Sequence, residues 1–203
     1  MKSIIKPFTS FTGRELKTEF VRKALHLLIA LVPSLVALDR SCTALLLMGG
    51  VLFYTLMESL RFLGFSPPIV SAATVVASRK REQEKFVLGP VTLGLGALLT
   101  LLLFPPQAAA AAIYALAFGD TASSLIGKFL GRFRPPFLNG KSIEGSLACL
   151  AVSTLTAFLV FREWEAALAA GIAATVFDAL PLGDFDNILI PLAAGLMVYL
   201  VKY

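Results

Sequence analysis

The feature that most constrains the fold is a repeat of long, mostly apolar stretches. They cover approximately residues 21–38, 41–60, 86–104, 107–127, 145–161, 164–183 and 186–202. A transmembrane helix needs roughly 17 to 25 such residues. Of the 203 residues 57% are hydrophobic and 15% are charged, whereas a soluble domain is about half apolar and about a quarter charged. The sequence therefore predicts an all-α, polytopic integral membrane helix bundle with about seven transmembrane helices.

The basic residues are distributed asymmetrically over the predicted connections. If the N-terminus is cytoplasmic, all but three of the 18 Lys and Arg residues lie on the cytoplasmic side, and the exceptions are Arg40, Arg162 and Lys202. Cytoplasmic loops of membrane proteins carry such an excess. We therefore expect a cytoplasmic N-terminus and, because the inner connections are also the longer ones, a functional site on the cytoplasmic face.

One membrane-embedded domain accounts for most of the chain. Residues 1–20 mix aromatic and basic side chains, which predicts an amphipathic segment along the headgroups, and residues 21–203 form the catalytic domain. Cys42 and Cys149 have no ligand spacing, so neither a disulfide nor a metal role is expected.

Ionisable residues gather at the helix ends predicted to face the cytoplasm. Each costs at least about 2.5 kcal/mol inside a span, so each needs a partner or a function. The set comprises Arg22, Lys23, His26, Glu58, Arg61, Lys85, Asp120, Lys141, Glu144, Asp178, Asp184 and Asp186. Taken singly, Glu58 with Arg61 is explained by an ion pair and His26 by a packed helix interface. Asp120 has no cation one turn away, which favours a functional role.

The combination of carboxylates with several cations is suited to phosphate chemistry. Asp120, Ser123, Ser124 and Gly127 recur at helical spacing and so share one face. Carboxylates and phosphate oxygens hold Mg²⁺, while Lys and Arg neutralise phosphate charge. Lys141 and Ser142 match the end of the P-loop motif G-x-x-x-x-G-K-[ST]. A P-loop is nevertheless excluded, because Pro135 occupies the position of the first glycine of the motif.

Six motifs occur in a characteristic order. They are RKxxH at 22–26, ExxR at 58–61, KxxxGP at 85–90, GDTASSLIG at 119–127, KSIEGS at 141–146 and DN followed by IP at 186–191. This order resembles the polyprenol kinase family, which includes dolichol kinase, phytol kinase and CTP-dependent diacylglycerol kinase and is distantly related to phosphatidate cytidylyltransferases. The resemblance extends over roughly residues 20–195.

The resemblance implies a membrane enzyme that transfers the terminal phosphate of a nucleotide, usually CTP, to a lipid alcohol with the help of a divalent metal. It implies a metal-binding or catalytic carboxylate at Asp120, a phosphate ligand at Lys141 and a second carboxylate at Glu144. Two positions depart mildly from the family pattern: Asp178 stands where the family has glutamate, and Ser142 where it has threonine.

On this basis we expect Mg²⁺ to be held by Asp120 with Asp186 or Glu144 assisting. The candidate bases are Asp120, Glu144 and His26, since histidine titrates near neutral pH. The predicted nucleotide or phosphate contacts are Arg22, Lys23, Lys85, Gly119, Ser123, Lys128, Lys141, Ser142, Gly145 and Ser146. The predicted supporting residues are Glu58, Arg61, Gly89, Pro90, Asp178 and Asn187.

The leading interpretation is a lipid-alcohol kinase, with CTP as the expected donor and ATP as the alternative. A cytidylyltransferase would release pyrophosphate and leave a CDP-lipid. A transporter of an anionic solute would need polar residues through to the outer side, and a structural membrane protein would not need Asp120. The sequence leaves open diacylglycerol, a polyprenol and a phytol-like alcohol as acceptor. We expect a plasma (cell inner) membrane location and no nucleic-acid partner.

Overall fold

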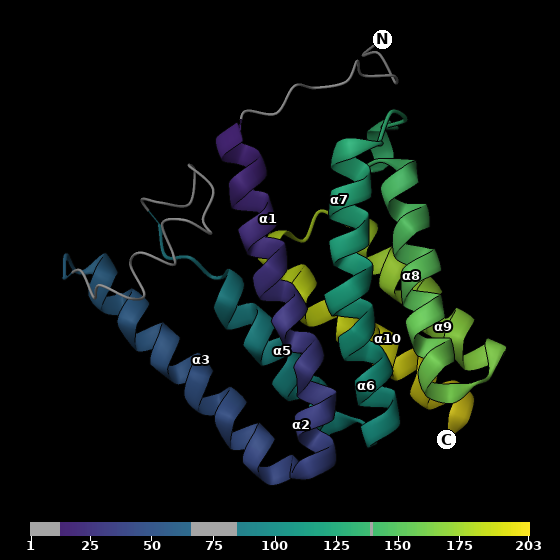
Figure 1. Cartoon of the computed structure of the whole chain (residues 1–203), viewed down its shortest axis with the longest axis horizontal. Coiled ribbons are helices and arrows are strands. Elements are labelled where there is room, and N and C mark those ends of the chain that lie inside the picture. Colours follow the sequence, from purple (N-terminus) through teal and green to yellow (C-terminus); the bar gives the residue numbers. More distant parts are fainter. Residues whose placement is uncertain (1–12, 66–84, 139) are drawn as a thin grey trace.

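The computed structural model describes residues 13–65, 85–138 and 140–203, and every regular element in these ranges is helical. The helices are α1 (Gly13–Leu28), α2 (Val32–Leu38), α3 (Arg40–Phe62), α5 (Gly89–Leu103), α6 (Pro106–Tyr114), α7 (Thr121–Phe129), α8 (Ile143–Phe161), α9 (Trp164–Ala179) and α10 (Asp186–Lys202). They run up and down as a bundle (Figure 1). The predicted all-α fold is confirmed.

Five helical stretches in the described part of the chain are long and apolar enough to cross a bilayer. They are Thr18–Leu38, Arg40–Phe62, Pro106–Phe129, Ile143–Phe161 and Gly183–Lys202. The other two predicted segments correspond to α5, with 15 residues, and α9, with 16. All seven predicted segments are thus helical, and the chain is a polytopic helical membrane protein. Of the predicted amphipathic segment, residues 1–12 lie outside the described residues, and α1 begins at Gly13.

Three of the long stretches are composite helices, and the last of them begins with the 3₁₀ turn η5 (Gly183–Phe185) before α10. In the first, the 3₁₀ turn η1 (Ile29–Leu31) joins α1 to α2. In the second, the π-helix η3 (Ala115–Asp120) joins α6 to α7. A π-helix inserts an extra residue into the turn and so changes which side chains face a neighbour. Asp120 is its last residue.

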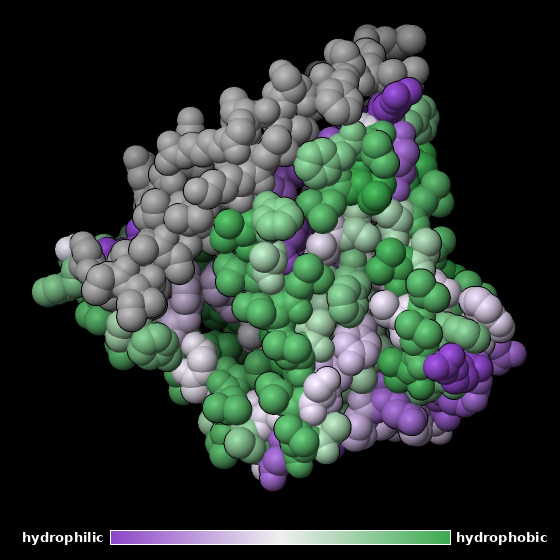
Figure 2. Space-filling model, viewed as in Figure 1, coloured by the Kyte–Doolittle hydropathy of each residue, from purple (hydrophilic) through white to green (hydrophobic). Residues whose placement is uncertain are grey.

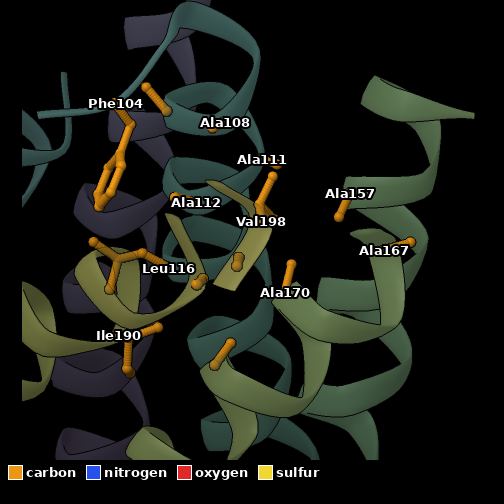
Figure 3. Packing of buried hydrophobic residues seen from close by; sticks show 14 of the residues in the cluster. Phe104, Ala108, Ala111, Ala112, Leu116, Ala157, Ala167, Ala170, Ile190 and Val198 are labelled. Atoms are coloured by element: carbon orange, nitrogen blue, oxygen red, sulfur yellow. The ribbon is translucent and has the colours of Figure 1, made fainter. Parts of the chain in front are cut away.

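The centre of the bundle is built from alanines. α8 packs along α9, and α10 packs along α9, α5 and α6. The fully buried side chains between them are mostly small, with a few larger ones such as Leu116, Ile190 and Val198 (Figure 3). Helices that meet through small residues approach closely and gain van der Waals contact, which is the main attraction available inside a bilayer.

Two glycines mark close contacts between a helix and the main chain of its neighbour. A Cβ on Gly96 of α5 would lie 2.1 Å from the main-chain oxygen of Asn187 in α10. A Cβ on Gly145 of α8 would lie 2.7 Å from the main-chain oxygen of Ser123 in α7. Both contacts involve main chain, which cannot move as a side chain can, so these positions fix α10 and α7 against their neighbours.

Helix α3 lies at the edge of the bundle (Figure 1), where it contacts α5 and α2. Its buried residues are Thr43 and Glu58, whereas large apolar side chains such as Leu45, Leu52 and Phe53 are exposed. Figure 2 shows that apolar side chains cover much of the visible face of the bundle. An apolar exterior of this kind is what a lipid environment requires.

The end of the bundle away from Asp120 is held by its own polar contacts. Lys202 at the end of α10 forms an ion pair with Glu163, which precedes α9. The guanidinium of Arg40 donates to the main-chain oxygen of Leu101 at 2.6 Å, satisfying a carbonyl in the last turn of α5.

Candidate active site

A buried carboxylate with two basic partners forms the centre of the polar cluster. Asp120 is 5% exposed. The ammonium of Lys23 donates a hydrogen bond to its Oδ2, and Nδ1 of His26 lies 3.0 Å from the same oxygen. Lys23 and His26 are three residues apart on α1 and share a face, as the sequence predicted. The three side chains join α1 to the π-helix across 97 positions of sequence.

A second buried carboxylate, Asp178, interacts electrostatically with Asp120. Asp178, in the last turn of α9, is 1% exposed. The hydroxyl of Ser123 donates to its Oδ2 at 2.6 Å, and the ammonium of Lys141 donates to its Oδ1 at 2.9 Å. Lys141 also donates to the main-chain oxygen of Asp178. The structure thus brings together two predicted phosphate ligands and one predicted supporting residue.

A third carboxylate completes the group. Asp186, the first residue of α10, interacts electrostatically with Asp120, Asp178, Lys23 and Lys141. It makes no hydrogen bond or ion pair with another residue in the described ranges. Among the described residues, Asp120 and Asp178 each form an ion pair with a lysine, whereas Asp186 forms none.

The start of α10 is tied to α5 by an amide side chain. Nδ2 of Asn187 donates to Oγ1 of Thr92 at 3.0 Å and lies 3.4 Å from the main-chain oxygen of Gly89. Gly89 and Pro90 form the first turn of α5. These predicted supporting residues position the helix turn that carries Asp186.

Sequence reasoning missed Glu19. This residue is 4% exposed and bridges α1 to α7. Its carboxylate accepts from Arg22 at 2.8 Å and pairs with Lys128 at 2.5 Å, which are both predicted phosphate ligands. Arg22 also interacts electrostatically with Asp120 and Asp186. The three-residue spacing of Glu19 and Arg22 on one helix was the available signal.

The predicted ion pair between Glu58 and Arg61 is present, and it binds the backbone of the residues that precede α5. Glu58 is fully buried, and its Oε1 lies 2.6 Å from Arg61 and accepts from the backbone N–H of Val87 at 2.8 Å. Arg61 donates to the main-chain oxygen of Lys85 at 2.8 Å. The side chain of Lys85 is exposed, and no contact to the Asp120 cluster is seen for it within the described part of the chain.

Glu144 lies apart from the other carboxylates. Its Oε1 accepts from the backbone N–H groups of Arg132 at 2.9 Å and Phe133 at 3.1 Å, so it supports the connection between α7 and α8. Ser142 caps α8 by accepting from the N–H of Gly145 at 3.1 Å. The buried hydroxyl of Ser146 has no hydrogen-bond partner among the residues that the structure describes.

The predicted metal ligands Asp120, Glu144 and Asp186 are not assembled as a set. Across residues 13–65, 85–138 and 140–203, no three His, Cys, Asp or Glu side chains lie close enough together to hold a metal ion. Asp120 contacts protein cations and Glu144 contacts backbone. Mg²⁺ commonly uses only one or two carboxylates together with substrate phosphates, and Asp186 with Asp120 fits that smaller requirement.

The main chain at Gly119 is pressed against α8. A Cβ at this position would lie 2.1 Å from the hydroxyl oxygen of Ser153. Gly119 therefore allows the π-helix to pack closely against α8, and its contact with phosphate stays a prediction.

Comparison with known proteins supplies relatives but no template. No family model matches the chain, and no solved structure matches it. A probable chloroplastic phytol kinase from Triticum aestivum is 26% identical over 221 residues, covering 98% of this chain and 73% of the relative. A probable chloroplastic phytol kinase 1 from Oryza sativa subsp. japonica is 26% identical, covering 98% and 70%.

A fungal relative is named as a CTP-dependent enzyme. The CTP-dependent diacylglycerol kinase 1 of Schizosaccharomyces pombe is 26% identical over 145 residues, covering 63% of this chain and 66% of the relative. Phytol kinases and a CTP-dependent diacylglycerol kinase are the groups that the six motifs resembled. The predicted relationship is confirmed.

Proposed function

We propose that this chain is a CTP-dependent lipid kinase that transfers the terminal phosphate of the nucleotide to the hydroxyl of a membrane lipid alcohol. The observation that carries the proposal is the buried contact of Asp120 with Lys23 and His26, beside Asp178 and Asp186. Relatives named as phytol kinases and a CTP-dependent diacylglycerol kinase support the reaction class.

The cations of the cluster are suited to the phosphates of the nucleotide. Lys23 forms an ion pair with Asp120, and Lys141 forms one with Asp178. Arg22 and Lys128 both form ion pairs with Glu19. Pairing makes these charges tolerable inside the bundle before the nucleotide arrives. Phosphate oxygens would then compete with the carboxylates for Lys23 and Lys141. Phosphoryl transfer asks the protein mainly for positioning and charge stabilisation, which these groups supply.

Two carboxylates are suited to Mg²⁺. Asp186 and Asp120 would hold the ion once Lys23 has moved to a phosphate. When bound, Mg²⁺ would neutralise charge on the phosphate oxygens. Glu144 is left out of this proposal because its oxygens are occupied by the backbone of residues 132 and 133.

The contact between Asp120 and His26 suggests how the lipid hydroxyl loses its proton. The hydroxyl oxygen forms a bond to the terminal phosphorus as the bond from that phosphorus to the bridging oxygen breaks, and CDP leaves. His26 takes the hydroxyl proton, and Asp120 orients the ring and stabilises its positive charge. Sequence reasoning found no partner for His26, because Asp120 is far away in the chain.

The site lies where a water-soluble nucleotide and a lipid can meet. Lys23 is in the first third of the span Thr18–Leu38, and Asp186 begins the last helix. The excess of Lys and Arg on the connections at this end supports a cytoplasmic position for the site. We propose the plasma membrane as the location.

Purified protein in lipid vesicles, incubated with γ-labelled CTP or ATP and a panel of lipid alcohols, tests the proposal. Labelled phosphate on a diacylglycerol, polyprenol or phytol-like alcohol with release of CDP is the expected result. Failure to label any alcohol, together with pyrophosphate release from CTP in the presence of phosphatidate, would instead identify a cytidylyltransferase.

A further inference from the structure

The connection between α7 and α8 carries apolar side chains on its outside. We refer to residues 129–138 and 140–142, the described residues of this connection, as the α7–α8 loop. Its exposed apolar residues are Phe129, Leu130, Phe133 and Phe137, of which Phe137 is 74% exposed. Polar residues are the usual occupants of a loop beyond a helix end, so a group of exposed apolar side chains is unusual at this position.

The loop has a defined internal structure. Glu144 accepts hydrogen bonds from the backbone of Arg132 and Phe133, and the N–H of Ile143 donates to the oxygen of Phe133 at 3.0 Å. Pro135 and Leu138 point inward and are buried. A loop built in this way holds its apolar tip in a fixed orientation.

Two arginines accompany the apolar tip and have different tasks. The guanidinium of Arg134 donates to the main-chain oxygens of Gly127 and Gly140, which closes the loop. Arg132 is exposed, and in the described ranges its side chain makes no hydrogen bond or ion pair. One cation is therefore free to meet an external anion beside the aromatic rings.

We propose that the α7–α8 loop is an anchor in the headgroup region of the leaflet next to the Asp120 cluster. Phe133 and Phe137 lie at the acyl boundary, and Arg132 binds the phosphate of an anionic phospholipid. Aromatic rings favour this interfacial depth, and juxtamembrane basic residues are attracted to anionic lipid. A nucleotide is a poorer occupant, because its phosphates have no use for four apolar side chains.

The anchor has a consequence for the catalytic cluster. The same loop ends in Lys141 and Ser142, and Lys141 is bound to Asp178. A loop fixed at headgroup depth therefore fixes the depth of Lys141 relative to the lipid hydroxyl. The anchoring itself is independent of the kinase reaction.

A fluorescent depth measurement tests the position of the loop. With Cys42 and Cys149 replaced by alanine, Phe137→Cys is labelled with a polarity-sensitive fluorophore and reconstituted in phosphatidylcholine vesicles containing phosphatidylglycerol. We expect strong quenching by a lipid carrying a nitroxide near the headgroup and weak quenching by iodide in water. The same label at Lys85→Cys, another exposed position, calibrates the response to iodide.

A second variant tests the anionic headgroup. Quenching at Phe137→Cys is compared for nitroxide-labelled phosphatidylglycerol and phosphatidylcholine, with and without Arg132→Gln. Loss of one basic residue should lower the preference for phosphatidylglycerol by up to about fivefold. Arg162→Gln, at the far end of the bundle, should leave the preference unchanged.

Three results would overturn the proposal. Quenching by iodide as strong as at Lys85→Cys would place the loop in water. Protection from both quenchers would mean that protein covers the loop, as a partner or a second copy would. An unchanged preference in Arg132→Gln would remove the headgroup contact. None of these measurements uses phosphate transfer, so they stand apart from the test of the kinase reaction.

Discussion

Asp120 shows how a single carboxylate is tolerated inside a membrane span. A carboxylate within the span Pro106–Phe129 is costly by itself, but Lys23 and His26 meet it from another helix. The pairing lowers the cost and concentrates three ionisable groups at one point. We therefore expect that replacing one of these three residues alters both phosphate transfer and the charge environment of the other two.

We expect Asp120→Asn to lower phosphate transfer by about 10²- to 10⁴-fold, because it removes the partner of His26 and a proposed metal ligand. The protein should still enter the membrane. Product formation from γ-labelled CTP, measured on purified protein, checks this. Asp184→Asn, the same substitution in the connection before α10, serves as the control and should be nearly silent. Activity of Asp120→Asn close to that of the control would remove Asp120 from the mechanism.

Glu19 should act on nucleotide binding more than on turnover. Glu19→Gln weakens the shared anchor of Arg22 and Lys128, and a hydrogen bond to a charged group contributes about 1.5 to 3 kcal/mol. We expect KM for the nucleotide to rise about tenfold or more with a smaller change in kcat. Steady-state kinetics separate the two.

The matched substitution for Glu19 is at the opposite end of the bundle. Glu163→Gln breaks the exposed pair with Lys202 and should change neither constant, because exposed pairs contribute little. Glu19→Asp, which keeps the charge, should recover part of the affinity. An unchanged KM in Glu19→Gln would assign the residue to packing alone.

At the residue scale, sequence was informative about composition and less so about contacts. The shared face of Lys23 and His26 followed from their spacing on one helix, and it is present. Glu19 and its contact with Lys128 were missed, since which side chains meet depends on helix rotation and tilt. Glu144 was expected among the carboxylates, but hydrogen bonds to the loop backbone keep it outside.

At the scale of elements, hydropathy located the helices well. The π-helix Ala115–Asp120 was not predicted, because a run of alanine and other apolar residues looks the same in either helix type. The main-chain contacts at Gly96 and Gly145 were likewise not visible. A glycine inside an apolar stretch is consistent with close packing but does not identify the neighbour.

Gly96→Ala tests the contact between α5 and α10. The added methyl group would meet the main-chain oxygen of Asn187, so the helices must separate. Overpacking of this kind costs about 1 to 3 kcal/mol. We expect a lower midpoint of thermal unfolding in detergent and reduced phosphate transfer, since Asn187 adjoins Asp186.

Gly49→Ala is the control for this glycine. Nothing lies within 4 Å of a Cβ at Gly49 on α3. Because alanine is about 1 kcal/mol better than glycine inside a helix, this variant should be neutral or slightly more stable. Equal behaviour of the two variants would mean that Gly96 does not set the helix spacing.

At the scale of the whole molecule, all seven apolar segments predicted from sequence are helical. The lengths differ, because α5 and α9 are shorter than the expected spans. Sidedness was inferred from the charges of the connections and stays a prediction.

The native cysteines provide a test of sidedness. Cys42 is exposed near the start of α3, and Cys149 is fully buried in α8. With a cytoplasmic N-terminus, Cys42 should react with a membrane-impermeant maleimide added to intact cells, and Cys42→Ser should abolish the labelling. Reaction only in inverted vesicles would reverse the proposed orientation.

The contact between Lys23 and Asp120 also bears on the order of events during synthesis. Lys23 emerges from the ribosome 97 residues before its partner. Until α7 has been made, the first helix carries Arg22, Lys23 and His26 without the carboxylate that neutralises them. The span Thr18–Leu38 is apolar enough to cross the bilayer, but we expect its final position to depend on the fourth apolar segment, which carries Asp120. The contact thus joins an early part of the chain to a later one, and it can form only once both have been made.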